Sequence, residues 1–240
     1  MINVLSFDTN QDGEENMIPI KDQISTRRVP FINYLLLLAN ISVFILQWLA
    51  GPNQEALIYQ FALIPASFTS GIGLGDITDI FSSMFMHAGL AHLGGNMLYL
   101  WIFGDNVEDS MGHTRFLLFY LIGGLVASLA HIFTNPGSQI PTVGASGAIA
   151  AVLGAYLVLY PNSRVLTIIP FGFFLRLTMI PAVIVLGLWF VLQLFSGVLS
   201  MGGPDVGGVA FWAHVGGFVA GVILAKVFAK KRYRDTYVRW

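Results

Sequence analysis

Apolar residues occur in six long runs, and polar and charged residues gather between them. We expect a transmembrane helix over each run, because about 20 apolar residues of helix span the roughly 30 Å hydrocarbon core of a bilayer. The predicted segments are about 31–50, 85–103, 116–133, 146–160, 177–199 and 209–228. The connection 52–80 is too interrupted by polar residues to span a membrane, and we expect short helices at the membrane interface there.

The fourth segment is short, and it begins at a serine. Between Ser146 and Tyr160 there are about 15 residues, or roughly 22 Å of helix, and Pro161 ends the helix because proline cannot continue it. This helix is shorter than the bilayer core. We therefore expect Ser146 to lie below the membrane surface, with a loop that dips to meet it.

The positions of the basic residues predict an orientation. All twelve lysine and arginine residues fall on one side of a six-pass arrangement, and the connections 51–84, 134–145 and 200–208 contain none. The positive-inside rule then places both termini in the cytoplasm. We expect a multi-pass protein of the cell (plasma) membrane whose outer face carries the cation-free connections.

Composition agrees with this class, since 55% of the residues are hydrophobic and 10% are charged. A net charge of −1 gives no reason to expect a nucleic-acid partner, and the lack of cysteine excludes disulfides and thiol chemistry. We predict a disordered cytoplasmic tail over 1–28, which has no signal-peptide pattern. We expect one membrane domain over 29–230. The remaining residues, 231–240, form a basic cytoplasmic tail that we expect to lie against anionic headgroups.

Three segments bring polar side chains to one depth near the outer face. The second, fourth and sixth segments all run inward in this topology. Toward their starts they carry, in order, His92 with Asn96, then Ser146, then His214. Polar groups within apolar helices are costly, and they are usually functional or mutually satisfied. The three stretches therefore mark a candidate site.

Small residues share the helix faces of the serine and the histidine: Ala150, Gly154, Gly217 and Gly221. Such stripes let two helices approach closely, and packing them together would bring the Ser146 hydroxyl within reach of the His214 imidazole. This pair has the parts of a nucleophile and its general base. No acidic residue lies near either in the second to sixth segments, so we expect a dyad rather than a triad.

The second segment offers His92, Asn96 and Tyr99 on one helix face. Neutral donors at this depth suit an oxyanion, and the free N–H of Ser146 at a helix start would point to the same place. The predicted reaction is acyl transfer to water, and hence peptide hydrolysis within the membrane.

At these residues the sequence resembles the rhomboid family of intramembrane serine proteases, over about 17–230. The shared motifs are Met86-His87-Ala-Gly-Leu-Ala-His92-Leu-Gly-Gly-Asn96, Phe103-Gly-Asp-Asn-Val-Glu108-Asp-Ser-Met-Gly112, Gly144-Ala-Ser146-Gly147 and Ala213-His214-Val-Gly-Gly217-Phe-Val-Ala-Gly221.

The resemblance implies an all-α, six-transmembrane-helix bundle with a short central fourth helix. It implies that Ser146 is the nucleophile and His214 the base, that His92 and Asn96 assist the oxyanion, and that Gly144 shapes the loop before the serine. It further implies a serine endopeptidase that needs no cofactor and no metal. The substrates would be single-pass or polytopic membrane proteins in the lipid bilayer, cut near its outer face, and no oligomeric state is implied.

The sequence departs from the family in two places. Many members carry a Trp-Arg pair in the first connection, whereas 51–84 contains neither residue type. Some members place a tyrosine four residues after the serine, where it stacks on the histidine, and here that position is Ala150.

Other patterns are weaker. A zinc protease would need His-Glu-x-x-His, and neither His87 nor His92 has such a partner. The stretch Gly73-Leu-Gly75-Asp76 matches the Gly-x-Gly-Asp of membrane aspartyl proteases, yet it lies in the polar first connection without a second intramembrane aspartate.

Several remaining polar residues suit structural roles. We expect 108–112 to cap the inner end of the second helix beside Arg115, and we assign structural roles to His113 and His131. His87 is open to a catalytic role or to a place in water at the helix entrance, and we favour an entrance or structural role.

Two other functions compete with proteolysis. A catalytically inactive relative would use the same fold to bind or escort membrane clients, although this chain retains both Ser146 and His214. A transporter would need a broken helix and polar groups at the membrane midplane, whereas no carboxylate or cation lines the second to sixth helices as a coupling site and no repeat is visible.

Overall fold

A computed structural model describes residues 18–69, 71, 73–171, 174–201 and 209–230. The helices are α1 (Phe31–Leu49), α2 (Gln54–Phe61), α3 (Leu74–Ser82), α4 (Leu90–Met111), α5 (His113–Thr134), α6 (Ser146–Leu159), α7 (Ala182–Ser200) and α8 (Phe211–Phe228). Short 3-10 helices are η1 (Gly51–Asn53), η2 (Pro65–Thr69) and η3 (Ser83–Phe85), and the strands are β1 (Ile18–Asp22), β2 (Arg164–Phe171) and β3 (Phe174–Pro181). The expectations for 1–17 and 231–240 lie outside the described residues.

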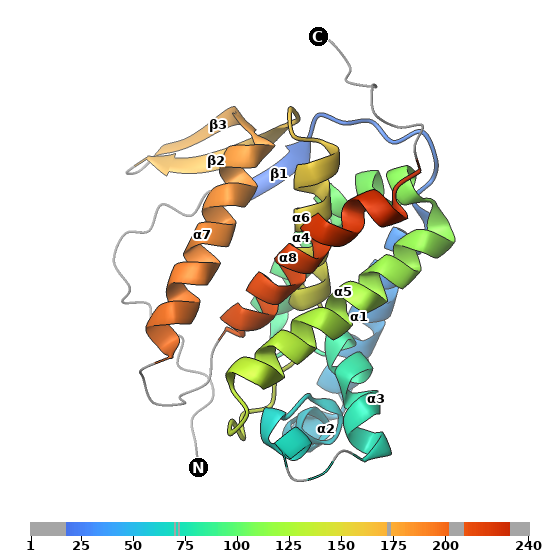
Figure 1. The fold of residues 1–240 in the computed structure, drawn as a ribbon, viewed down its shortest axis with the longest axis vertical. Helices are drawn as coiled ribbons and strands as arrows, with labels where there is room; N and C mark the ends of the chain where they lie inside the picture. Colours follow the sequence, from blue (N-terminus) through green and yellow to red (C-terminus); the bar gives the residue numbers. More distant parts are fainter. Residues whose placement is uncertain (1–17, 70, 72, 172–173, 202–208, 231–240) are drawn as a thin grey trace.

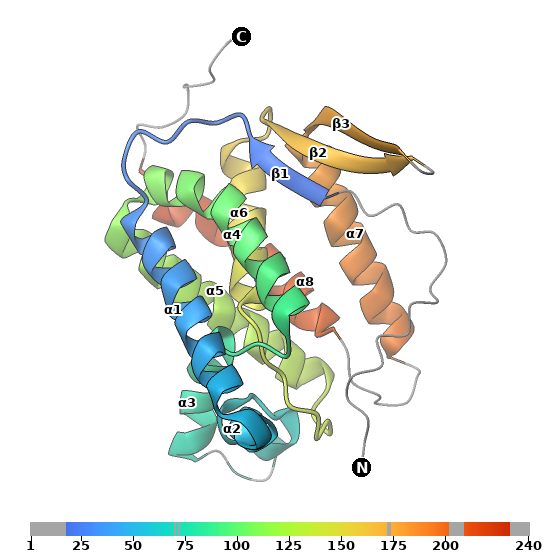
Figure 2. The ribbon, with the colours of Figure 1, turned by 180° about the vertical axis from the view of Figure 1, so that it is seen from behind.

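The fold is mostly helical and suits a membrane. Within the described residues, α1, α5, α7 and α8 are the four helices long and apolar enough to cross a bilayer, and α6 is a shorter apolar helix of 14 residues. Strands β1 to β3 lie at one end of the bundle, which we call the sheet end (Figures 1 and 2). Helices α2 and α3 lie at the opposite end, which we call the loop end.

Helix α6 lies inside the bundle. Its residues from Ala148 to Tyr156 are all buried, and it packs against α4, α5 and α8. Helices α4, α6 and α8 run in the same direction (Figure 1). Their first turns meet around Ser146, and their last turns meet at the sheet end. The short apolar helix is thus shielded along most of its length by longer neighbours.

Glycines let the backbones of α6 and α8 touch. A Cβ placed on Gly221 would lie 2.0 Å from the Ala151 carbonyl oxygen, and one on Gly217 would lie 2.1 Å from that of Gly147. On the other helix, a Cβ at Gly154 would lie 2.2 Å from the carbonyl oxygen of Phe218. The predicted packing of the two small-residue stripes is confirmed.

The expectation of an all-α protein is wrong. In the described part of the chain, β1, β2 and β3 form an antiparallel sheet in that order, with Ile18 opposite Ile168 and Asp22 opposite Val165. Residues 18–22 therefore pair with a hairpin. The expectation of a disordered tail over 1–28 is wrong for these residues.

The fifth apolar segment was placed too early. Residues 177–181 belong to β3, and α7 begins only at Ala182. Polar Arg176 and Thr178 alternate with apolar neighbours at the period of a strand. Pro181 also favours an extended conformation for the residue before it, so the helix cannot begin earlier.

The second apolar segment was also misplaced. Helix α4 begins after Gly89, whose backbone is extended, and continues to Met111 through Asp105, Glu108 and Asp109. The helix therefore extends beyond the expected segment 85–103 and contains carboxylates. These acidic groups lie in the last turns of α4, far along the helix from the site formed by its first turns.

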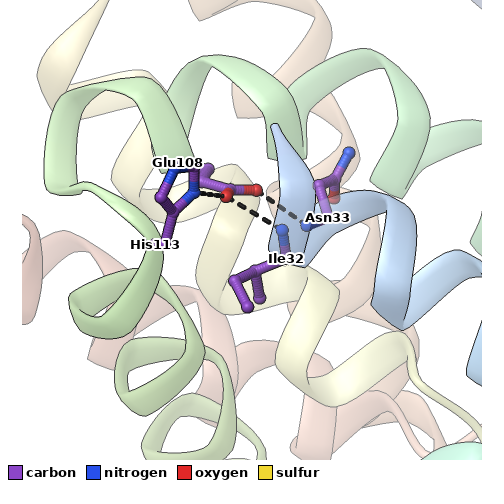
Figure 3. A network of polar contacts seen from close by, with 4 residues as sticks. All are labelled: Ile32, Asn33, Glu108 and His113. Atoms are coloured by element: carbon purple, nitrogen blue, oxygen red, sulfur yellow. Dashed lines mark hydrogen bonds and ion pairs between the residues drawn. The ribbon is translucent and has the colours of Figure 1, made fainter. Parts of the chain in front are cut away.

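Gly112 caps the inner end of α4, as expected for 108–112, whereas the Glu108 side chain caps a different helix. Its carboxylate accepts the backbone N–H groups of Ile32 (3.0 Å) and Asn33 (2.7 Å) at the start of α1, and it also contacts His113 Nδ1 (Figure 3). The first N–H groups of a helix lack partners within the helix and attract negative charge. Glu108 thus joins α4 to the N-terminus of α1, which explains why a carboxylate that is 1% exposed is tolerated.

Asp22 is a second buried carboxylate at the sheet end. It accepts hydrogen bonds from the Tyr156 hydroxyl (2.6 Å) and from Asn106 Nδ2 (2.7 Å), so it links β1 to α6 and α4. Burial raises the pKa of the Asp22 carboxyl from 3.8 to about 7, although the Tyr156 hydrogen bond opposes this rise. The strand is thereby connected to the helix that begins at Ser146.

The close contact of α6 and α8 predicts the effect of a single methyl group. Gly221→Ala should lower the apparent melting temperature in detergent micelles, because overpacking costs about 1–3 kcal/mol. Gly187→Ala on α7 is the matched control, since a Cβ there meets nothing within 4 Å. Equal melting temperatures for the two variants would contradict the close contact.

Asp22 predicts a pH dependence of stability. The folded protein keeps the Asp22 proton up to about pH 7, whereas the unfolded chain releases it near pH 4, so the free energy of unfolding should fall as pH rises between these values. The slope is at most about 1.4 kcal/mol per pH unit. Thermal unfolding from pH 5 to 8 should show this fall for the parent relative to Asp22→Asn. Parallel curves for the two proteins would refute it.

Candidate active site

Ser146 and His214 meet where α6 and α8 begin. Ser146 is the first residue of α6, and His214 lies in the first turn of α8. The glycine contacts hold the two helices close enough for His214 Nε2 to lie 2.7 Å from Ser146 Oγ. The structure therefore brings this predicted pair into hydrogen-bond contact across 68 residues of sequence.

Two residues of α7 complete the surroundings of the imidazole, and our sequence interpretation missed both. Gln193 Oε1 lies 2.6 Å from His214 Nδ1, and the Trp189 ring lies 5.8 Å from the His214 ring at an angle of 34°. Trp189 thus covers a ring that Ala150 is too small to stack against. The signal available in the sequence was Gln193 itself, a polar side chain within an apolar helix.

His92 and Asn96 face the loop that leads into Ser146. Gly144 has a φ of +133°, and a Cβ there would lie 2.7 Å from His92 Nε2 and 3.6 Å from Asn96 Nδ2. Glycine is required at such a place, because the backbone conformation and the close approach both exclude a side chain. These three residues and Tyr99 line the same cavity as Ser146 and His214.

Asn96 is held by a second histidine. Its Nδ2 lies 2.9 Å from His87 Nε2, and the His87 ring makes an edge contact with that of His92 at 5.1 Å. His87 is fully buried, and its backbone N–H and C=O bond the side chain of Gln47. A position in water is therefore wrong for His87, and its contacts are those of a structural residue that orients the Asn96 amide.

The first connection is anchored without a Trp-Arg pair. Leu63 and Thr142 exchange two backbone hydrogen bonds, of 3.1 and 2.8 Å. The Gly144 N–H donates to the Ser83 carbonyl oxygen at 2.9 Å. The loop before Ser146 is thereby fixed to the connection between α1 and α4.

The cavity has a volume of about 1010 Å³. His131, which also lines it, bonds Thr142 Oγ1 at 3.0 Å and so supports the loop before the serine. A hydroxyl with an imidazole acceptor, beside further polar donors, can attack a carbonyl carbon and stabilise the resulting oxyanion.

Asp76 lies apart from this cavity and caps a helix. Its Oδ2 accepts the Gly73 N–H at 2.8 Å at the start of α3. Hydrogen bonds from Ser67 and from Gly73 lower the pKa of the Asp76 carboxyl. The Gly-x-Gly-Asp stretch is thus a capping motif.

Comparison with known proteins gives one family. The rhomboid domain model matches residues 74–231. Rhomboid protease GluP of Bacillus subtilis is 31% identical over 232 residues, which are 92% of this chain and 41% of that relative. Mitochondrial rhomboid protein 1 of Saccharomyces cerevisiae is 30% identical over 212 residues, which are 84% of this chain and 55% of the relative.

A human relative, the mitochondrial presenilin-associated rhomboid-like protein, is 30% identical over 131 residues. These residues are 54% of this chain and 33% of the human protein. The chain thus spans between about a third and just over half of the curated relatives named here.

The contact of Gly144 with His92 predicts a steric effect on Ser146. Gly144→Ala should slow the reaction of Ser146 with a fluorophosphonate by up to about 100-fold, because small displacements of reacting groups have effects of this size. Gly94→Ala, on the same helix as His92 but facing open space, should react at the parental rate. If both variants react like the parent, Gly144 does not set the geometry of the site.

Proposed function

The chain belongs to the rhomboid family, and from this premise we propose that it is an intramembrane serine endopeptidase with Ser146 as nucleophile and His214 as general base. The observation that carries the proposal is the 2.7 Å contact between Ser146 Oγ and His214 Nε2 at the wall of a cavity that His92 and Asn96 also line, inside an apolar bundle. Burial of an imidazole without partners would be costly, and the contact of His214 with the Ser146 hydroxyl offsets part of that cost.

In the proposed reaction, His214 accepts a proton and passes it on once in acylation and once in deacylation. Ser146 Oγ attacks the substrate carbonyl carbon, and its proton passes to His214 Nε2. The C–N bond then breaks as the amine nitrogen takes this proton and leaves. A water molecule next attacks the acyl carbon and gives a proton to His214, which returns it to Ser146 Oγ as the ester bond breaks.

We propose that the oxyanion forms between α4 and the start of α6. The Ser146 N–H is among the first N–H groups of its helix and has no partner within it. Asn96 has two N–H donors and uses one on His87, so the other can serve the substrate oxygen. His92, beside Gly144, supplies a further donor.

The proposed topology has six membrane helices, namely α1, α4, α5, α6, α7 and α8. Helix α6 is about 21 Å long by its 14 residues, so Ser146 at its loop end would lie within the bilayer. Basic residues of the described chain lie toward the sheet end: Arg164 begins β2, and the backbone N–H groups of Arg27 and Lys230 bond Asp109 and Ser110 in the last turn of α4. This supports a cytoplasmic sheet end, with both termini inside and the plasma membrane as location.

We propose one membrane domain over 29–230, to which the pairing of β1 adds residues 18–22. The remaining N-terminal residues and 231–240 would be cytoplasmic tails. The substrates would be single-pass or polytopic membrane proteins, cut near the outer face of the lipid bilayer where the Ser146 cavity lies. No cofactor takes part in this mechanism.

Cleavage of a transmembrane reporter tests the proposal. In proteoliposomes the parent should cleave it, and Ser146→Ala or His214→Ala should lower the rate by at least about 100-fold, because each removes a reacting group. Ser128→Ala is the matched control, since Ser128 lines the same cavity on α5 without belonging to the dyad, and it should keep most of the activity.

Two results would contradict the proposal. Cleavage by Ser146→Ala at the parental rate would exclude the dyad. A parent that binds transmembrane peptides but never cleaves them would instead favour a catalytically inactive rhomboid-like protein that binds or escorts membrane clients.

A further inference from the structure

The His214 imidazole is bonded at both nitrogens, and the two partners come from different helices. Nε2 lies 2.7 Å from Ser146 Oγ on α6, and Nδ1 lies 2.6 Å from Gln193 Oε1 on α7. His214 is 8% exposed, so water has little access to either nitrogen. The state of the ring therefore depends on these two neighbours.

A neutral imidazole carries one proton, and its position decides whether His214 can act as a base. Nε2 accepts the Ser146 proton only if the ring proton is on Nδ1. A buried Nδ1–H needs an acceptor, and the Gln193 carbonyl oxygen is placed to accept it. With the proton on Nε2, the imidazole would donate to Ser146 and could not activate it.

A neutral amide suits this position better than a carboxylate. Helix α7 contains no ionisable residue and has the composition of a membrane span, where a charged group is costly. The titratable side chains that act on His214 from neighbouring helices are His92 of α4 and His131 of α5. Gln193 supplies the acceptor without adding a charge.

The remaining contacts of α7 fix the glutamine against α8. Trp189 lies one turn before Gln193 and covers the His214 ring, and Phe190 stacks on Phe218 with ring centres 4.6 Å apart. The same helix face therefore places the amide and shields the imidazole from lipid.

We propose that Gln193 is a positioning residue that holds His214 in the Nδ1–H form, so that Nε2 faces Ser146 as an acceptor. In this role α7 supplies the third member of the constellation, and the dyad expected from the sequence becomes Ser146-His214-Gln193. The inference rests on the proposed function, because the position of the ring proton affects catalysis only if His214 accepts the serine proton.

The test compares two substitutions of similar size in the full chain. Gln193→Met removes the acceptor and should lower the rate constant of fluorophosphonate labelling and the kcat of reporter cleavage by roughly 10- to 100-fold, which is less than the loss of a whole general base. KM and the melting temperature should stay near the parental values. Leu194→Met, at an exposed neighbouring position of α7, is the control and should change neither rate.

Gln193→Glu gives a readout, the pH profile of labelling, that a purely structural role of Gln193 would leave unchanged. A carboxylate beside Nδ1 stabilises the imidazolium, so the acidic limb of the pH profile of labelling should move to higher pH by about one unit. Activity above that limb should persist. If Gln193→Met labels like the parent, or if both variants lose activity equally with an unmoved pH profile, Gln193 has no positioning role.

The ring proton can also be located without any activity. In ¹⁵N-histidine-labelled protein, subtraction of the His214→Ala spectrum should assign a protonated Nδ1 to His214 of the parent, and this form should be depleted in Gln193→Met. A protonated Nε2 in the neutral parent would overturn the inference. Failure of the proposed function is distinguishable from failure of this inference, because a parent without protease activity could still carry the ring proton on Nδ1 of His214.

Discussion

The backbone contact between α6 and α8 is the constraint on which the site depends. Lipid offers no hydrophobic gain for bringing two apolar helices together, so close packing and hydrogen bonds must hold them. Gly217 and Gly221 lie against the carbonyl oxygens of Gly147 and Ala151, where a larger residue would overlap the backbone. The contact reaches up to the start of both helices. There the glycines bring the two backbones close enough for the side chains of Ser146 and His214 to form a hydrogen bond.

Helix α4 connects this site to the opposite end of the bundle. Its first turns hold His92 and Asn96 beside the loop that precedes Ser146, and its last turns hold buried carboxylates. Glu108 binds the start of α1, and Asp22 of the sheet binds the far end of α6 through Tyr156. Satisfied polar groups of this kind fix neighbouring elements in a specific arrangement. The serine helix is therefore held by backbone contact along its length and by polar contacts at its far end.

The local and periodic features of this fold were predictable from the sequence, and the long-range ones were not. Apolar runs, the short helix at Ser146 and the small-residue stripes depend on neighbouring residues, and the packing of those stripes follows from their spacing. The sheet was missed because 177–181 is apolar enough to resemble the start of a helix, and because β1 pairs with a strand far along the chain. The pairing of Gln193 with His214 and of Glu108 with α1 likewise depends on how separate helices pack.

The central claim is that contact with His214 activates the Ser146 hydroxyl. Mapping the fluorophosphonate adduct by mass spectrometry of the folded protein in micelles tests this most directly. We expect a single modified peptide with the adduct on Ser146, which disappears when His214 is replaced by alanine. An adduct on another residue, or one that forms on Ser146 equally fast without the imidazole, would contradict it.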